Sequence, residues 1–167
     1  MTIYILRHGI AVERGTAGYK RDADRPLTPK GERRLWQITE AMERMELSFD
    51  LILSSPYLRA RQTAEIVAEA FKPEKRLELC DELAADAEPK DAIRFLRALD
   101  PAPENVLLVG HEPYLSQLVS LLVAGDTGCG IELKKGGLCK LRTESLKPGR
   151  CATMEWLLTP KQMLAMG

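Results

Sequence analysis

The stretch from Thr2 to Gly9 constrains the fold and the function of this chain more than any other. The residues from Thr2 to Leu6 all favour β-structure, and the last four of them are apolar. An apolar run of this length indicates a strand that is buried on both faces, as in a parallel sheet. The run ends abruptly in Arg7-His8-Gly9. Because open α/β sheets bind ligands at the carboxyl ends of their strands, we expect Arg7 and His8 to border a binding site.

Two further strands are expected to end at the same edge of the sheet. The apolar run Val106–Val109 precedes His111, the second of only two histidines in the chain. The run Phe49–Leu53 is followed by a polar turn and by Arg59, in the first turn of the next helix. One histidine at a strand end is more often a cap for a backbone carbonyl than a catalytic group. Two histidines with arginines at one edge instead favour a functional site.

The rest of the pattern alternates between strands and helices. The polar stretch Glu13–Arg25 predicts a long loop, and Thr28 with Pro29 is a typical helix start. Near the end of the chain, two alternating segments flank a turn signal and predict an antiparallel hairpin. The segments are Leu138–Arg142 and Ala152–Trp156 for the hairpin, Leu77–Cys80 for a short edge strand, and about Tyr57–Phe71, Lys90–Leu99 and Leu115–Leu122 for further helices. We therefore expect an α/β fold, a three-layer α/β/α sandwich with a mostly parallel central sheet and an antiparallel edge formed by the C-terminal hairpin.

Length and charge limit the classes of function. A chain of 167 residues fits a single domain, here residues 1–167. Lys plus Arg and Asp plus Glu number 24 each, and a net charge of zero argues against binding to nucleic acid or to a membrane surface. No apolar run approaches the roughly 18 residues of a membrane span. No signal peptide precedes the first strand, so we expect a cytoplasmic protein.

Neither a metal nor an organic cofactor is expected. The four cysteines are scattered and, with two histidines, give no zinc-ligand spacing. Without an export signal they are expected to be reduced thiols. No GxGxxG motif follows a predicted strand, which argues against a nucleotide cofactor.

The groups at the predicted sheet edge suit a phosphoryl group. An arginine near a helix N-terminus adds its charge to exposed backbone N–H groups, as Arg59 would. Guanidinium groups bind phosphate oxygens in bidentate fashion, so several arginines and two imidazoles can hold a dianion. Arg61 points elsewhere on the same helix, and we expect it to be solvated.

With these residues the chain resembles the histidine phosphatase superfamily, also called phosphoglycerate-mutase-like, and within it the SixA-type protein phosphohistidine phosphatases. The resemblance rests on four blocks in the order of the family, from the start of the chain to the helix after His111. They are Leu6–Gly9, Arg25-Pro26-Leu27-Thr28 with Gly31, Ser54–Ala64 and Val109–Pro113. The motif Arg-His-Gly alone is weakly specific, whereas the four blocks together are strongly so.

The resemblance implies a role for each matched position. His8 would be the nucleophile that becomes phosphorylated, and Arg7, Arg59 and His111 would form the phosphate pocket. Arg25 would add a further arginine on the substrate side. A histidine nucleophile must be neutral, and nearby arginines oppose its protonation.

One departure from the larger family members concerns the general acid. Those proteins carry long insertions that cover the pocket and supply the acid, whereas Lys72–Glu88 is only about 17 residues here. Asp81 and Glu82 are possible acids in this segment, and a plain surface-loop role is equally expected. A weak acid matters little for phosphohistidine, whose P–N bond is labile, and much more for an alkoxide leaving group.

We therefore expect a phosphatase that hydrolyses phosphohistidine on a signalling protein, such as a histidine phosphotransfer domain, through a phosphohistidine intermediate on His8. One alternative is a phosphatase for small phosphate monoesters that uses Glu82 or Asp81 as its acid. Another is a phospho-ligand binding module without turnover. The presence of both His8 and His111 argues against a module, because a reader of phosphate needs arginines but no nucleophile.

Overall fold

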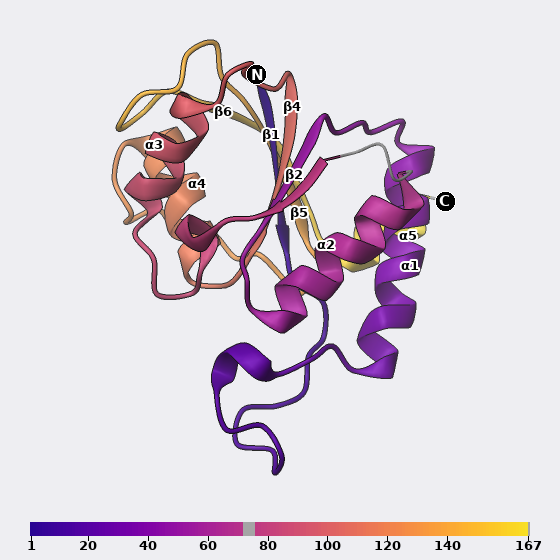
Figure 1. The fold of residues 1–167 in the computed structure, drawn as a ribbon. Coiled ribbons are helices and arrows are strands. Elements are labelled where there is room, and N and C mark those ends of the chain that lie inside the picture. Colours follow the sequence, from indigo (N-terminus) through magenta and orange to yellow (C-terminus); the bar gives the residue numbers. More distant parts are fainter. Residues whose placement is uncertain (72–75, 167) are drawn as a thin grey trace.

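The computed structural model describes residues 1–71 and 76–166 (Figure 1). Among these residues, none of the helices has the length and the apolarity that a membrane crossing requires. In chain order the elements are β1 (Thr2–Arg7), the short 3-10 helix η1 (Asp22–Asp24), α1 (Pro29–Arg44), β2 (Leu51–Ser54), α2 (Leu58–Ala70), β3 (Arg76–Leu79), η2 (Asp81–Leu83), α3 (Pro89–Ala98), β4 (Asn105–Gly110), α4 (Tyr114–Ala124), β5 (Leu138–Arg142), β6 (Thr153–Leu158) and α5 (Pro160–Ala165).

The strands form one mixed sheet in the order β3-β2-β4-β1-β5-β6. Parallel pairs join β1 to β4, β4 to β2 and β2 to β3. The hairpin of β5 and β6 adds to β1 through an antiparallel pair. The prediction of a mostly parallel sheet with an antiparallel C-terminal edge is therefore confirmed.

Helices cover both faces of this sheet. Side chains alternate between the faces along a strand, so Ile3 and Ile5 of β1 pack in one core with α3 and α4. Tyr4 and Leu6 pack in a second core with α1, α2 and α5. Figure 1 shows these two groups of helices on opposite sides of the strands. Burial on both faces explains the unbroken apolar run of β1, and the three-layer sandwich is confirmed.

The first turn of α1 packs closely against the segment that follows β1. As predicted, Pro29 is the first helical residue, and the Thr28 hydroxyl accepts a hydrogen bond from the Gly31 N–H at 3.0 Å. Gly31 also faces the backbone of Ile10, whose carbonyl oxygen an added Cβ would overlap. The helix end can thus rest directly against the segment that follows His8.

Some predicted boundaries differ from the structure. The second strand is Leu51–Ser54 instead of Phe49–Leu53, and the last strand runs on to Leu158. The helix α5 after it was not predicted. Residues 72–75 of the predicted short connection Lys72–Glu88 lie outside the described residues, and its remainder includes β3 and η2.

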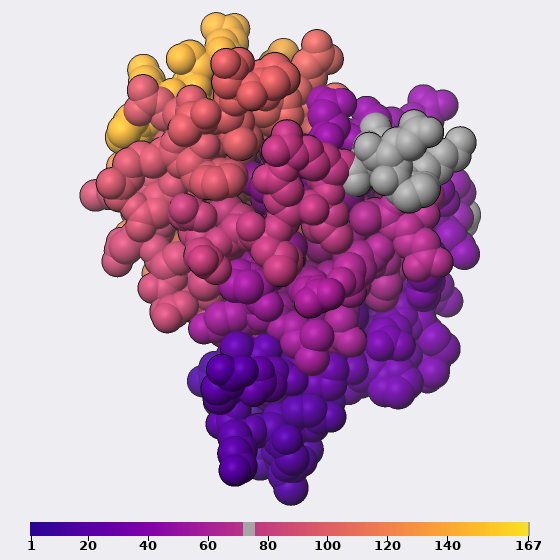
Figure 2. All heavy atoms as spheres, in the orientation of Figure 1, coloured from indigo at the N-terminus to yellow at the C-terminus, as the bar shows by residue number. Residues whose placement is uncertain are grey.

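The loop after β1 extends beyond the carboxyl edge of the parallel strands (Figure 1). It contains η1 and returns to the body of the protein at α1. In the space-filling view of Figure 2, the indigo N-terminal atoms form the projection at the bottom of the molecule. The loop therefore borders the space at this edge of the sheet in which a ligand would bind.

Candidate active site

The structure brings Arg7, His8, Arg59 and His111 together at the carboxyl edge of the sheet. They follow β1, β2 and β4, which are neighbours in the sheet, so their ends converge. The ring centroids of His8 and His111 are 5.1 Å apart. All four residues line one pocket of about 310 Å³, together with Arg25. Arginines and histidines from three separate stretches of the sequence therefore share a space large enough for a phosphoryl group.

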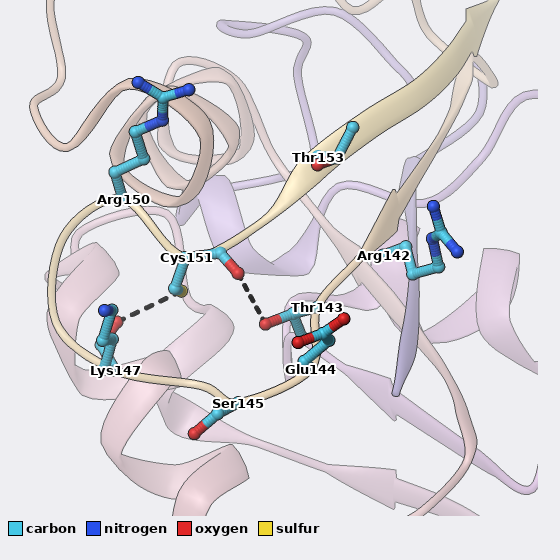
Figure 3. Close-up of a pocket in the computed structure, with 8 residues that line it drawn as sticks. All are labelled: Arg142, Thr143, Glu144, Ser145, Lys147, Arg150, Cys151 and Thr153. Carbon is cyan, nitrogen blue, oxygen red and sulfur yellow. Dashed lines mark hydrogen bonds between the residues drawn. The ribbon is translucent and has the colours of Figure 1, made fainter.

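A second depression lies at the opposite end of the sheet (Figure 3). It is lined by the turn between β5 and β6, with the cations Arg142, Lys147 and Arg150. Arg142 pairs with Thr2, at the far end of β1 from His8. Its Thr143 and Cys151 are already hydrogen-bonded within the turn, and neither histidine lies there. The chemistry of the chain is concentrated in the His8 pocket.

His8 presents an unprotonated ring nitrogen to its neighbours in this pocket. Its Nδ1 lies 2.7 Å from the Gly9 carbonyl oxygen, which can only accept, so Nδ1 carries the proton. The other nitrogen, Nε2, accepts a hydrogen bond from Nε of Arg59 at 3.2 Å. Burial, with the nearby charges of His111 and Arg59, lowers the pKa of His8 well below its usual value, despite the Gly9 contact. The imidazole is therefore neutral at pH 7, with Nε2 as its nucleophilic atom.

His111 is arranged as a hydrogen-bond donor. Its Nε2 lies 2.8 Å from the Ser55 hydroxyl, which itself accepts the Tyr57 N–H at 3.3 Å. The hydroxyl can give its proton to Nε2, and in that tautomer of His111 the ring proton lies on Nδ1. Burial, followed by the charge of Arg59, lowers the pKa of His111 to about 3. A neutral His111 still donates through Nδ1–H.

Two buried donors at the pocket have no partner within the described part of the chain. They are Nδ1 of His111 and Nε of Arg7. Arg7 is held by a hydrogen bond from its NH1 to the Leu133 carbonyl at 2.9 Å. Buried polar groups are nearly always hydrogen-bonded, so unpaired donors beside cations favour a site that binds an anion.

Arg25 lines the pocket but is tied to a carboxylate that the sequence analysis did not single out. Its NH2 and Nε donate to Oδ1 of Asp22 at 2.7 and 3.0 Å. Burial raises the pKa of Asp22, but hydrogen bonds from Arg25 and Arg59 outweigh it and hold the pKa well below its usual value. Asp22 lies in a loop of alternating charges, and nothing in that pattern distinguished it from Asp24.

Thr63 links the two chain segments that carry His8 and Arg59. Its hydroxyl oxygen accepts the Gly9 N–H at 3.1 Å and donates to the Arg59 carbonyl at 2.7 Å. Thr63 and Ser55 both lie in the block Ser54–Ala64, but their orienting contacts could not be deduced from one sequence. Through these two hydrogen bonds, Thr63 fixes the position of the loop after β1 relative to the start of α2.

The two predicted acids lie away from the pocket. Burial raises the pKa of the Cys80 thiol to about 12, and this thiol donates to Oε2 of Glu82 at 3.2 Å. Glu82 borders a separate depression, and Asp81 is exposed. Within the described residues, the carboxylates that line the His8 pocket are Glu13 and Glu112. The position of Glu112 directly after His111 was the one signal for it in the sequence.

Comparison with known proteins agrees with this geometry. The sequence profile of the histidine phosphatase superfamily (branch 1) matches residues 3–85. An uncharacterized protein of Picosynechococcus sp. is 40% identical over 145 residues, or 86% of each chain. The phosphohistidine phosphatase SixA of Escherichia coli strain K12 is 31% identical over 130 residues, 76% of this chain and 77% of SixA.

A solved structure has the same fold. The protein histidine phosphatase SixA complexed with tungstate matches with a TM-score of 0.81 and 25% identity, over 96% of this chain and 98% of that chain. The chain therefore belongs to the histidine phosphatase superfamily, in its SixA-type branch, and is a hydrolase that acts on phosphoryl groups.

Proposed function

We propose that this protein removes the phosphoryl group from phosphohistidine on a signalling protein of the histidine phosphotransfer type, by way of a phosphohistidine intermediate on His8. The observation that supports this most is the Nε2 atom of His8. It is unprotonated, it lies 3.2 Å from Nε of Arg59, and it borders the same pocket as the unpaired donors of Arg7 and His111.

In the first step, Nε2 of His8 attacks the phosphorus atom of the substrate. The P–N bond to the substrate imidazole breaks, its electron pair stays with that imidazole, and the imidazole takes a proton from solvent. Arg7, Arg59 and the Nδ1–H of His111 donate to the equatorial oxygens, where phosphoryl transfer gathers negative charge. Positioning and charge stabilisation supply most of the catalysis in such a reaction.

The second step returns the enzyme to its starting state. A water oxygen attacks the phosphorus atom on His8, the P–Nε2 bond breaks, and inorganic phosphate leaves while the water proton passes to solvent. Between the steps the His8 ring is cationic, because Nε2 carries the phosphoryl group while Nδ1 keeps its proton. The Gly9 carbonyl, 2.7 Å from Nδ1, stabilises that charge by accepting a hydrogen bond from the Nδ1–H group.

The placement of the two predicted acids supports phosphohistidine over the alternative in which Glu82 or Asp81 serves a small phosphate ester. Glu82 is hydrogen-bonded to Cys80 outside the pocket, and Asp81 does not line it. An alkoxide leaving group needs a proton donor at this point, whereas the labile P–N bond needs it less. Relatives named phosphohistidine phosphatase, and a SixA structure that holds the oxyanion tungstate, add support for a phosphorylated protein as partner.

The test is a comparison of kcat/KM between substrates. A phosphorylated histidine phosphotransfer domain is set against phosphoserine and an aryl phosphate, with His8→Ala as the inactive control. We expect kcat/KM for phosphohistidine to exceed that for the alkyl ester by at least ~10²-fold, the usual worth of a general acid. Equal or faster hydrolysis of the alkyl ester would favour the small-molecule phosphatase. Phosphate binding without turnover of any substrate would favour the binding module.

A further inference from the structure

The Arg59 guanidinium is held from three directions. Its Nε donates to Nε2 of His8 at 3.2 Å, its NH1 to the backbone carbonyl of Asp22 at 2.7 Å, and its NH2 to Oδ2 of Asp22 at 2.8 Å. Only 4% of the Arg59 side chain is exposed. Both terminal nitrogens are therefore anchored on one residue of the loop after β1, and the third nitrogen then meets the nucleophile.

The same carboxylate also binds Arg25, through its other oxygen. Oδ1 of Asp22 receives two N–H groups of Arg25 while Oδ2 receives one from Arg59, so one side chain orients two arginines of the pocket. Arg14 adds a further contact to Oδ1, but its side chain is 81% exposed. An ion pair as exposed as that contributes little.

The Asp22 carboxylate is not one of the groups that line the space where an anion would bind. Arg25 and Arg59 line the pocket of about 310 Å³, whereas Asp22 is not among its lining residues. A guanidinium has five N–H groups, and Arg59 uses three in the contacts above. Two N–H groups remain for an oxyanion. Asp22 can thus hold Arg59 while a phosphoryl group occupies the pocket.

We propose that Asp22 is a positioning residue for phosphoryl transfer, which holds Arg59 and Arg25 in the orientation that receives the phosphoryl oxygens beside His8. This inference rests on the proposed function for its effect on turnover, but its effect on anion binding stands independently. Without the carboxylate, two long cationic side chains would repel each other. Misplacement of a catalytic group by about 1 Å can cost ~10²-fold in rate.

The chain offers a matched control for Asp22. Asp24 lies in the same 3-10 turn, and Arg21 donates to its two oxygens at 2.8 and 2.7 Å. The side chains of Arg21 and Asp24 are 77% and 44% exposed, and Asp24 does not line the pocket. Asp22→Asn and Asp24→Asn therefore remove the same charge from the same turn, but only the first removes a partner of Arg59.

The experiment measures two quantities for each variant, kcat/KM on phosphohistidine protein and the Kd of inorganic phosphate by calorimetry. For Asp22→Asn we expect kcat/KM to fall by ~10- to 100-fold and phosphate to bind several-fold more weakly. Asp24→Asn should match the wild type in both. If Asp22 instead competed with the anion, Asp22→Asn would bind phosphate more tightly, which would overturn the proposal. Equal effects of the two variants would overturn it as well.

A double-mutant cycle separates positioning from a general effect on folding. Arg59→Lys keeps the charge but loses the planar donors that Asp22 orients. If Asp22 acts through Arg59, Asp22→Asn should cost less in the Arg59→Lys background than in the wild type, and what remains is its effect through Arg25. Fully multiplicative losses would contradict this. Should Asp22→Asn fail to fold, Asp22→Glu takes its place in the cycle. A wild-type protein that turns over no phosphohistidine would reject the proposed function, and the phosphate Kd values would still test Asp22.

Discussion

Burial beside arginines keeps both imidazoles of the pocket uncharged. For His8 this leaves Nε2 ready to attack, and for His111 it leaves one N–H to donate. The pKa of each ring lies below the usual value near 6.5, with burial as the main cause. The carbonyl of Gly9 and the hydroxyl of Ser55 then decide which nitrogen of each ring holds the proton. At this scale, the chemistry depends on backbone and hydroxyl partners as much as on the charged residues.

The first residue-scale prediction concerns the dependence of kcat/KM on pH. Protonation of His8 would block attack, and its lowered pKa moves that event to acid pH. We expect the acidic limb of the profile to lie clearly below pH 6.5, after correction for spontaneous hydrolysis of the substrate. An acidic limb at the usual histidine value would contradict a buried, neutral nucleophile.

A second residue-scale prediction concerns Glu82. Its carboxylate accepts the Cys80 thiol and borders a depression other than the His8 pocket. Glu82→Gln and Asp81→Asn should therefore leave phosphohistidine hydrolysis close to the wild-type rate. Steady-state kinetics checks this, with His8→Ala as the negative control. A loss near ~10²-fold would identify one of these residues as a true general acid.

At the scale of elements, the sequence predicted what depends on local pattern and burial. The pattern correctly predicted the buried runs of β1 and β4, the Thr28 cap and the C-terminal hairpin. The convergence of His8, Arg59 and His111 followed from the rule that parallel strands end at one edge. Asp22 was not predicted, because its role depends on a loop folding back 37 residues from its partner Arg59. The short helix α5 was missed, although Thr159 and Pro160 repeat the start signal that Thr28 and Pro29 give for α1.

The element-scale prediction concerns the packing of α1 against the segment after His8. In Gly31→Ala the new Cβ would overlap the Ile10 carbonyl oxygen, and backbone atoms cannot move aside cheaply. We expect the free energy of unfolding in urea to fall by ~1–3 kcal/mol, the usual cost of overpacking. Gly130→Ala is the matched control, because an added Cβ there meets nothing within 4 Å and its φ is not positive. Equal stability of the two variants would show that the close approach is not constraining.

At the scale of the whole molecule, the numbers of acidic and basic residues are equal, so the net charge is zero. We therefore expect the two buried histidines to dominate the dependence of the free energy of unfolding on pH in mild acid. A histidine whose pKa is lowered on folding binds protons more readily in the unfolded chain. Stability is then complete above about pH 6.5 and declines as the pH falls toward the folded value, about 3 for His111. Asp22, whose pKa is also lowered, destabilises the fold in the same direction as the pH falls, but its window begins only below about pH 4.

Between about pH 6 and 4, we therefore expect the free energy of unfolding to fall by up to ~1.4 kcal/mol per pH unit through His111, and His8 adds a further fall of the same sign. Urea titrations at a series of pH values measure this slope. His111→Gln should make the slope shallower while His8 maintains part of it. A wild-type stability that stays flat over this range would contradict neutral, buried imidazoles.

The identity of the phosphorylated residue is the most direct test of a mechanism through His8. The protein is mixed with a phosphohistidine protein that carries a radioactive phosphoryl group, quenched within the first turnover, and mapped by peptide. Nucleophilic attack by Nε2 predicts label on His8, in a bond that is labile to acid and stable to base, and no label in His8→Ala. Label on Ser54, Ser55 or a cysteine, or substantial turnover by His8→Ala, would contradict it.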